Sequence, residues 1–170
     1  MNWQTLIREI PDFPQPGILF RDITPLLANG EAYRQAINTL ADFARELKAE
    51  LIVGPEARGY VVGAPLAFAL EAGFVPVRKK GKLPGQTISV QYGLEYGKDV
   101  LEIHKDAILP GQRVVVADDL LATGGTMSAT MNLVEKLGGN VVGAAFLIEL
   151  SELRGREKLG NLDVYTLVQY

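Results

Sequence analysis

The residues best suited to chemistry lie together in residues 113–126, which read RVVVADDLLATGGT. Apolar residues typical of a strand buried on both faces are followed by two adjacent acids, Asp118 and Asp119. A short loop then leads into a predicted helix; its residues are Ala122, Thr123, Gly124, Gly125 and Thr126. In open α/β sheets, ligands bind beyond the carboxyl ends of the strands. The segment therefore predicts a ligand site where a strand passes into a helix.

The residue types indicate which ligand this site would take. Backbone N–H groups of a glycine-containing loop at a helix N-terminus bind anions, and Thr123 and Thr126 add hydroxyl donors. Ionised carboxylates only accept hydrogen bonds, so Asp118 and Asp119 suit the paired hydroxyls of a sugar. The anion-binding loop and the two acids together predict a site that binds a ribose 5-phosphate. The alternative is a strand with a polar turn and a capped helix, but two acids beside Thr-Gly-Gly-Thr favour the ligand. A Walker loop is excluded, because no Gly-Lys-Ser/Thr follows.

The composition limits the class of protein and its partners. The chain has 170 residues, of which 48% are hydrophobic and 22% charged, as in ordinary globular proteins. It has no cysteine, no apolar run of about 20 residues and no secretion signal, so we expect a cytoplasmic protein with no membrane span. Its net charge of −3 argues against a general nucleic-acid binder.

Hydrophobic patterning predicts an α/β fold with a mostly parallel central sheet flanked by helices. Apolar residues at three- and four-residue steps predict a helix over residues 31–48. Strands are then expected to alternate with helices, which favours parallel pairing. The predicted strands are 51–53, 74–77, 114–117, 141–148 and 164–168, and the predicted helices are 59–71 and 125–137.

Two segments depart from this alternation. Residues 1–30 form a predicted N-terminal hood, in which the Pro- and Gly-rich residues 12–30 are expected to be ordered but irregular. Within residues 79–106, the stretches 86–92 and 100–104 alternate like hairpin arms and predict a projecting β-hairpin flap. The whole chain, 1–170, is interpreted as a single domain.

We call residues 122–126 the phosphate loop. The segment that contains it, residues 113–126, resembles the signature of type I phosphoribosyltransferases that binds phosphoribosyl pyrophosphate (PRPP). Residues 111–127 are also similar to the adenine-specific branch, and three further segments resemble it: residues 16–27 (PGILFRDITPLL), 81–85 (GKLPG) and 94–97 (LEYG). The resemblance runs over nearly the whole chain and in the right order. It implies transfer of the 5-phosphoribosyl group from PRPP to N9 of adenine, giving AMP and pyrophosphate in purine salvage. It also implies a homodimer.

Because the chain is acidic, pyrophosphate needs a local positive site. The resemblance implies that Arg58 binds it, from a loop with an unusual peptide bond just before the arginine, and Arg suits bidentate phosphate contacts. It further implies that Arg78, Lys79 and Lys82 are phosphate ligands, with Arg78 a candidate for action across a dimer interface. The alternative is a solvated basic loop. The pair Glu56-Ala57 replaces the Asp-Ser of some relatives, and we expect it to be tolerated because the backbone matters there.

The resemblance also implies the catalytic group and the adenine pocket. Many relatives carry an acid in the phosphate loop where this chain has Ala122. The adenine branch brings a glutamate from the flap instead, which places Glu95 as the general acid at the purine N7. By position alone, Glu95 is a hairpin-tip acid. Adenine is expected to stack on Phe20, otherwise a core residue, while main-chain groups near Leu19 and Arg21 read its edge.

No cluster of His and carboxylates has metal-ligand spacing, so we expect no tightly bound metal, and Mg²⁺ should arrive with PRPP. Two other functions compete with this interpretation. One is a transferase for hypoxanthine or xanthine, and Ala122 argues against the hypoxanthine branch. The other is a PRPP-sensing regulator that binds DNA. The acidic charge, Glu95 and the short segment before Pro16 argue against that regulator.

Overall fold

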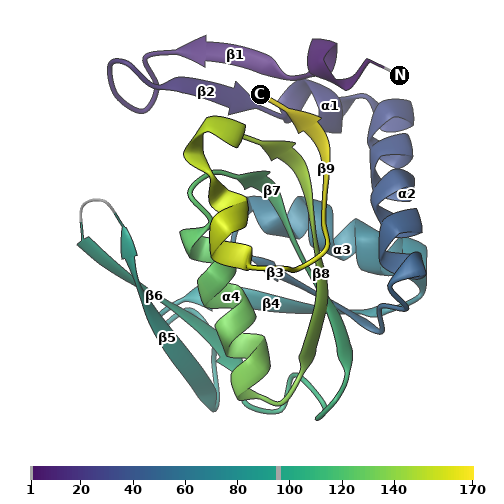
Figure 1. Ribbon diagram of the computed structural model, residues 1–170, viewed down its shortest axis with the longest axis vertical. Coiled ribbons are helices and arrows are strands. Elements are labelled where there is room, and N and C mark those ends of the chain that lie inside the picture. The colour runs from purple at the N-terminus through teal and green to yellow at the C-terminus, as the bar shows by residue number, and fades with distance from the viewer. Residues whose placement is uncertain (1, 95–96) are drawn as a thin grey trace.

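A seven-stranded sheet runs through the centre of the computed structural model, which describes residues 2–94 and 97–170 (Figure 1). The strand order is β5-β6-β4-β3-β7-β8-β9. Neighbours from β4 to β9 pair in parallel, whereas β6 pairs antiparallel with both β4 and β5. The prediction of a mostly parallel sheet is confirmed. The strands are β3 (Leu51–Pro55), β4 (Gly73–Lys79), β5 (Thr87–Leu94), β6 (Gly97–His104), β7 (Arg113–Leu121), β8 (Asn140–Glu149) and β9 (Val164–Gln169).

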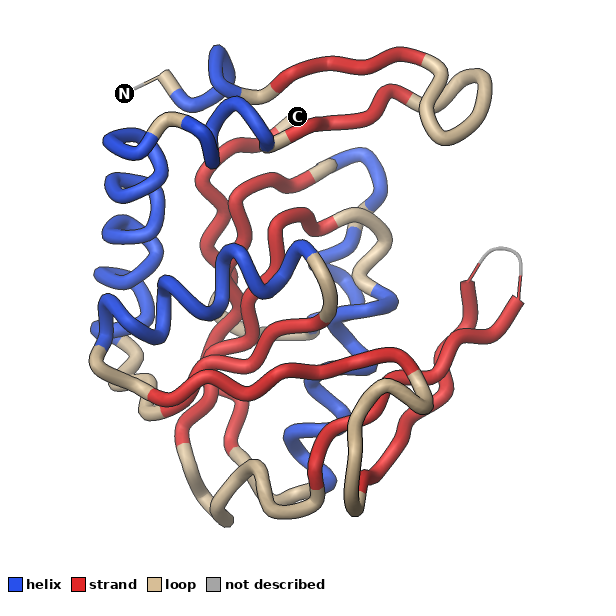
Figure 2. The backbone as a smooth tube through the Cα atoms, turned by 180° about the vertical axis from the view of Figure 1, so that it is seen from behind, coloured by secondary structure: helices blue, strands red, loops and turns tan. Residues whose placement is uncertain are grey.

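Helices cover both faces of this sheet, as predicted. Helices α2 (Gly30–Glu46) and α3 (Arg58–Leu70) pack on one face, and α4 (Gly125–Lys136) packs on the other (Figures 1 and 2). The Asn29 side chain caps α2 by accepting a hydrogen bond from the Ala32 N–H at 3.1 Å. Most of the predicted apolar stripe of α2 is buried. Its buried members are Ala32, Ala36, Ile37, Leu40 and Ala44. The predicted Phe43 and Leu47 are partly buried, and Ala41 is buried although it was not predicted. No helix among the described residues is long and apolar enough to cross a membrane.

Strand β7 is longer than its apolar run. The sequence predicted a strand of residues 114–117 that ends at the acids, but β7 continues through Asp118 and Asp119 to Leu121. The cause is its neighbour, because β8 pairs in register with Asp118, Leu120 and Leu121 and satisfies their backbone groups. Both acids therefore sit on rigid, paired backbone.

The N-terminal hood is more regular than predicted. Strands β1 (Arg8–Pro11) and β2 (Leu19–Asp22) form an antiparallel pair with Ile10 opposite Phe20. The short helix α1 (Thr24–Ala28) follows, and the Asp22 carboxylate accepts the Thr24 N–H at 2.9 Å. The expectation of an irregular segment over residues 12–30 was thus wrong in part, since the partner of β2 lies outside it. Three 3₁₀ turns complete the elements: Trp3–Leu6, Ser151–Leu153 and Gly155–Leu159.

The flap hairpin extends away from the body at one edge of the sheet (Figure 1). Its strands β5 and β6 pair antiparallel, from Thr87 opposite His104 to Leu94 opposite Gly97. The base of the flap is nevertheless part of the core, because Leu101 and Ile103 of β6 are buried beside α4. The sequence predicted a projection separate from the core, and the pairing of Arg78 with Glu102 explains the difference, since it joins β6 to β4.

Candidate functional site

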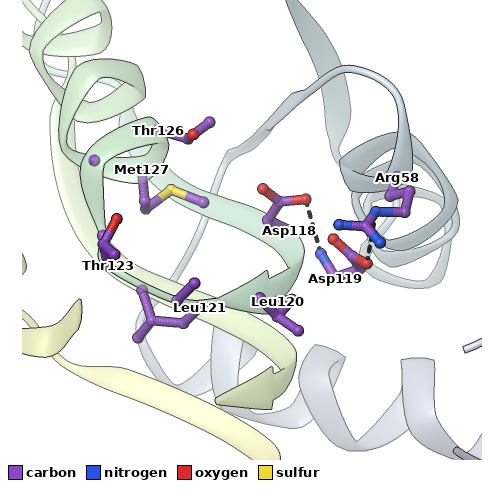
Figure 3. Close-up of a pocket in the computed structure, with 11 residues that line it drawn as sticks. Arg58, Asp118, Asp119, Leu120, Leu121, Thr123, Thr126 and Met127 are labelled. Atoms are coloured by element: carbon purple, nitrogen blue, oxygen red, sulfur yellow. Dashed lines mark hydrogen bonds and ion pairs between the residues drawn. The ribbon is translucent and has the colours of Figure 1, made fainter. Parts of the chain in front are cut away.

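Because β3, β4 and β7 are parallel, their carboxyl ends lie side by side at the same end of the sheet. The chain order reverses between β3 and β7, which is where α/β sheets bind ligands. A pocket of about 200 Å³ lies there, lined by Arg58, Asp118, Asp119 and residues 120–127 (Figure 3). The predicted arginine, which is distant in sequence, therefore shares one cavity with the acid pair and the phosphate loop.

The phosphate loop passes directly into α4. Gly124 is the N-cap residue, with a φ of +77° that favours glycine. The first N–H groups of a helix have no partner within the helix, so those at the start of α4 face the pocket as anion donors. Thr123 and Thr126 lie on this side of the pocket in Figure 3. The arrangement has the donors that a phosphate requires.

The acid pair faces the loop across the same pocket. Asp118 Oδ1 accepts the Asp119 N–H at 2.9 Å, and Arg58 Nε lies 3.1 Å from Asp119 Oδ2 (Figure 3). Burial and the neighbouring Asp119 carboxylate raise the pKa of Asp118 well above its ordinary value. Burial also raises the pKa of Asp119, although the Arg58 guanidinium opposes this. Within the described residues, the buried Asp119 Oδ2 has the Arg58 guanidinium as its ion-pair partner and accepts no well-aligned hydrogen bond, so it can still accept one from a ligand.

A second pocket, of about 260 Å³, lies between the hood and α3. Its lining residues are Phe20, Asp22, Ile23, Thr24, Leu27, Ala57, Arg58 and Val61. Phe20 packs edge-to-face on Phe13, with ring centroids 5.2 Å apart, and is half-buried. Leu19 and Arg21 lie on the same strand but do not line the pocket, and the Arg21 guanidinium lies 3.7 Å from the centroid of the Tyr170 ring.

Arg58 belongs to both pockets. Its guanidinium carbon lies 5.2 Å from the centroid of the Phe20 ring, while its Nε pairs with Asp119. The two cavities therefore adjoin at one arginine, a relation that the sequence did not reveal. The cis peptide bond near it joins Glu56 to Ala57, one bond earlier than the position expected from the resemblance.

The remaining basic residues predicted for this site, Arg78, Lys79 and Lys82, line neither of these two pockets. Arg78 and Lys82 contact the Glu56 carboxylate. Lys79 Nζ lies 3.1 Å from Asp99 Oδ2 of the flap strand β6. The predicted general acid, Glu95, lies outside the described residues.

Comparisons with known proteins decide the family. The sequence model of the phosphoribosyl transferase domain matches residues 25–166. A curated adenine phosphoribosyltransferase of Brevibacillus brevis is 63% identical over 170 residues, all of both chains. The chain belongs to the adenine phosphoribosyltransferase family.

Solved structures of this family agree with the fold. The adenine phosphoribosyltransferase of Thermoanaerobacter pseudethanolicus has a TM-score of 0.96 and 56% identity, covering 99% of this chain and 98% of its own. The Saccharomyces cerevisiae adenine phosphoribosyltransferase, solved with an imino-altritol bisphosphate and adenine, has a TM-score of 0.92 and 43% identity, covering 98% and 96%. The type I phosphoribosyltransferase fold predicted from the sequence is confirmed.

The segment at Gly155 supports the phosphate loop from behind, a contact that the family signature did not suggest. Gly155 packs so closely behind the phosphate loop that a Cβ there would collide with the Ala122 carbonyl oxygen. The next residue, Arg156, binds Glu149 through two hydrogen bonds of 2.7 Å each. Glu149 ends β8 and is buried, so this pair fixes the Gly155 segment to the sheet.

Gly155→Ala should therefore disturb the phosphate loop from behind. We expect AMP affinity to fall about tenfold, since an added methyl group in a tight contact costs roughly 1–3 kcal/mol of strain. Gly30→Ala is the matched control, because a Cβ at Gly30 meets nothing within 4 Å. Isothermal titration of AMP into both variants checks this, and equal affinities would show that the loop does not depend on Gly155.

Proposed function

We propose that this site joins adenine to the ribose of PRPP, giving AMP and pyrophosphate, which is the reaction of the family to which the chain belongs. The observation that carries the proposal is the shared arginine. The pocket with the acid pair and phosphate loop adjoins the pocket with Phe20, and Arg58 lines both. A sugar phosphate and a flat base bound in these pockets meet where the new bond must form.

The roles on the PRPP side follow from charge. The N–H groups and hydroxyls of residues 122–126 are proposed to bind the 5′-phosphate, and Asp118 and Asp119 the ribose hydroxyls. Pyrophosphate gains charge as its bond to C1′ breaks. Four cations are proposed to stabilise that charge: Arg58, Arg78, Lys79 and Lys82.

Adenine is proposed to stack on the exposed face of Phe20, with its edge on main-chain groups near Leu19 and Arg21. The Saccharomyces cerevisiae relative was solved with adenine, which supports a base site in this fold. As the bond from N9 to C1′ forms, the bond from C1′ to pyrophosphate breaks and the leaving group takes the electron pair. A proton carried on N7 leaves the N9 lone pair free to attack. Glu95, predicted from the resemblance as the general acid at N7, is the proposed group: it accepts this proton as a base when AMP forms and acts as the general acid, returning the proton to N7, in the reverse reaction.

Magnesium is proposed to enter with PRPP. No group of three or more His, Cys, Asp or Glu side chains suited to a metal exists in the described part of the chain. Asp119 Oδ2, whose ion-pair partner is the Arg58 guanidinium, would accept a hydrogen bond from a ribose hydroxyl of the Mg²⁺-bound substrate. When bound, Mg²⁺ offsets pyrophosphate charge. Two finer points belong to the proposal: a cytoplasmic location, and assembly as a homodimer, which is typical of the family and measurable by sedimentation.

Base selectivity tests the proposed function. Purified protein with Mg²⁺ and PRPP should convert adenine with a kcat/KM about 10³-fold or more above those for hypoxanthine, guanine and xanthine, because a site that hydrogen-bonds one base rejects others strongly. Faster conversion of another base would move the chain to a different branch. PRPP binding without turnover of any base would favour the regulator.

Arg58→Ala should weaken PRPP binding about 10- to 150-fold, since a lost charge-assisted hydrogen bond costs roughly 1.5–3 kcal/mol. Adenine affinity should change by less than about threefold, because only the weaker contact of a cation with the Phe20 ring is lost. Arg45→Ala is the control, as Arg45 pairs with Asp42 on the exposed face of α2. Calorimetry with each ligand checks the split. Equal losses for both would assign Arg58 a structural role.

A further inference from the structure

Glu56 is a buried acid to which the reaction proposed above gives no task. Its side chain is only 8% exposed, yet its carboxylate touches three basic residues at and just after the end of β4. Arg78 Nε donates to Oε2 at 3.0 Å, and Lys82 Nζ lies 3.3 Å from Oε1. The Lys79 N–H also donates to Oε1, at 2.8 Å. One carboxylate therefore links the loop after β3 to the end of β4 and to the loop that follows it.

These contacts fix where the cations point. Arg78 and Lys82 lie close enough to repel each other, and Arg78 Nη1 also donates to the Lys82 carbonyl oxygen at 3.2 Å. The side chains of Arg78 and Lys82 are 37% and 52% exposed, so a ligand can reach them, whereas the acid beneath them is covered. Burial opposes ionisation of Glu56, but hydrogen bonds from Lys79, Arg78 and Lys82 lower its pKa, so it is charged at neutral pH.

We infer that Glu56 is a positioning residue for the pyrophosphate site: it holds Arg78 and Lys82 side by side so that their outer N–H groups receive the pyrophosphate of PRPP. The inference rests on the proposed function, because it requires these cations to bind pyrophosphate. It also assigns a side-chain role at a position where the sequence suggested that only the backbone matters.

Two other roles make different predictions. If Glu56 only neutralised the cations, its loss would strengthen the binding of pyrophosphate. If it only tied β3 to β4, its loss would weaken every ligand of the site alike. Positioning predicts weaker PRPP and pyrophosphate binding with unchanged AMP binding, since AMP lacks the pyrophosphate.

The test compares Glu56→Gln with the wild type in steady-state kinetics. We expect the KM for PRPP to rise about tenfold, as for loss of an organised charged contact. The kcat at saturating PRPP and the KM for adenine should change by less than about twofold. The Kd of magnesium pyrophosphate should rise with the KM for PRPP, while the Kd of AMP stays constant. Asp42→Asn is the control, because Asp42 also pairs with an arginine but on an exposed surface.

Glu56→Asp provides a second variant if Glu56→Gln does not fold. It keeps the charge, but its side chain is one methylene shorter and cannot reach all three partners, so the KM for PRPP should again rise selectively. An unchanged or lower KM for PRPP would overturn the inference, as would a parallel loss of AMP affinity. A wild-type protein that forms no AMP would instead refute the proposed function, so the two failures are distinguishable.

Discussion

Replacing Glu95 with Gln should lower kcat by about 10²–10⁴, the usual contribution of a positioned acid or base. Gln keeps the size of the side chain and can still donate a hydrogen bond, but it cannot transfer a proton. Residue 122 of the phosphate loop is Ala, so this loop position offers no acid that could substitute for Glu95. AMP affinity should change little, because the acid pair and phosphate loop remain intact. Steady-state kinetics with adenine, with AMP titration in parallel, measures both.

Glu46→Gln is a suitable control for this experiment, since Glu46 is an exposed acid at the end of α2. A near wild-type kcat for the Glu95→Gln variant would show that Glu95 is not an acid–base catalyst. Glu95 would then be a positioning residue or a surface residue. Collapse of kcat and AMP affinity together would mean that the flap is structural, and the division between a binding core and a catalytic flap would be mistaken.

Asp118→Asn and Asp119→Asn should each weaken PRPP and AMP binding by about 10- to 150-fold, the equivalent of roughly 1.5–3 kcal/mol for one charge-assisted hydrogen bond. Both ligands carry the ribose hydroxyls, so both should lose affinity, whereas pyrophosphate alone should not. Calorimetry with all three ligands checks the pattern. Unchanged PRPP affinity in both variants would refute the ribose assignment.

Although Asp118→Asn should weaken ligand binding, it should raise the stability of the folded protein. Because burial and Asp119 raise the folded-state pKa of Asp118, ionisation costs stability at neutral pH, and this cost disappears as the pH falls through that raised pKa. Asn removes the cost at every pH and can still accept the Asp119 N–H. The ligand-free variant should therefore melt at a higher temperature than the wild type at pH 7, with a smaller difference at acidic pH.

Much of the fold and of the site's composition followed from local pattern. The apolar stripe of α2 and the run of β-branched residues in β7 predicted a helix and a buried strand, because burial dictates both periods. The acids Asp118 and Asp119 and the phosphate loop were predicted to lie together because they are adjacent in sequence. Arg58 was placed at the same site by the resemblance to the family, not by local pattern.

What the sequence missed depends on contacts between distant segments. The hood strand β2 takes its partner from residues 8–11, and β7 continues past its apolar run because β8 pairs with it. Glu56 meets Arg78 across 22 positions, and no local spacing marks such a contact. The one available signal was the pair Glu56-Ala57 in place of the Asp-Ser of some relatives, and it was interpreted as a tolerated replacement.

Paired product formation is the measurement that tests the central claim most directly. Wild-type protein mixed with adenine, PRPP and Mg²⁺ should form AMP and pyrophosphate in equal amounts, and chelation of the Mg²⁺ should stop both. Equal yields mean that the group leaving C1′ and the base bonding to it meet in one site. Pyrophosphate released without AMP, or PRPP bound without release of either product, would contradict the account.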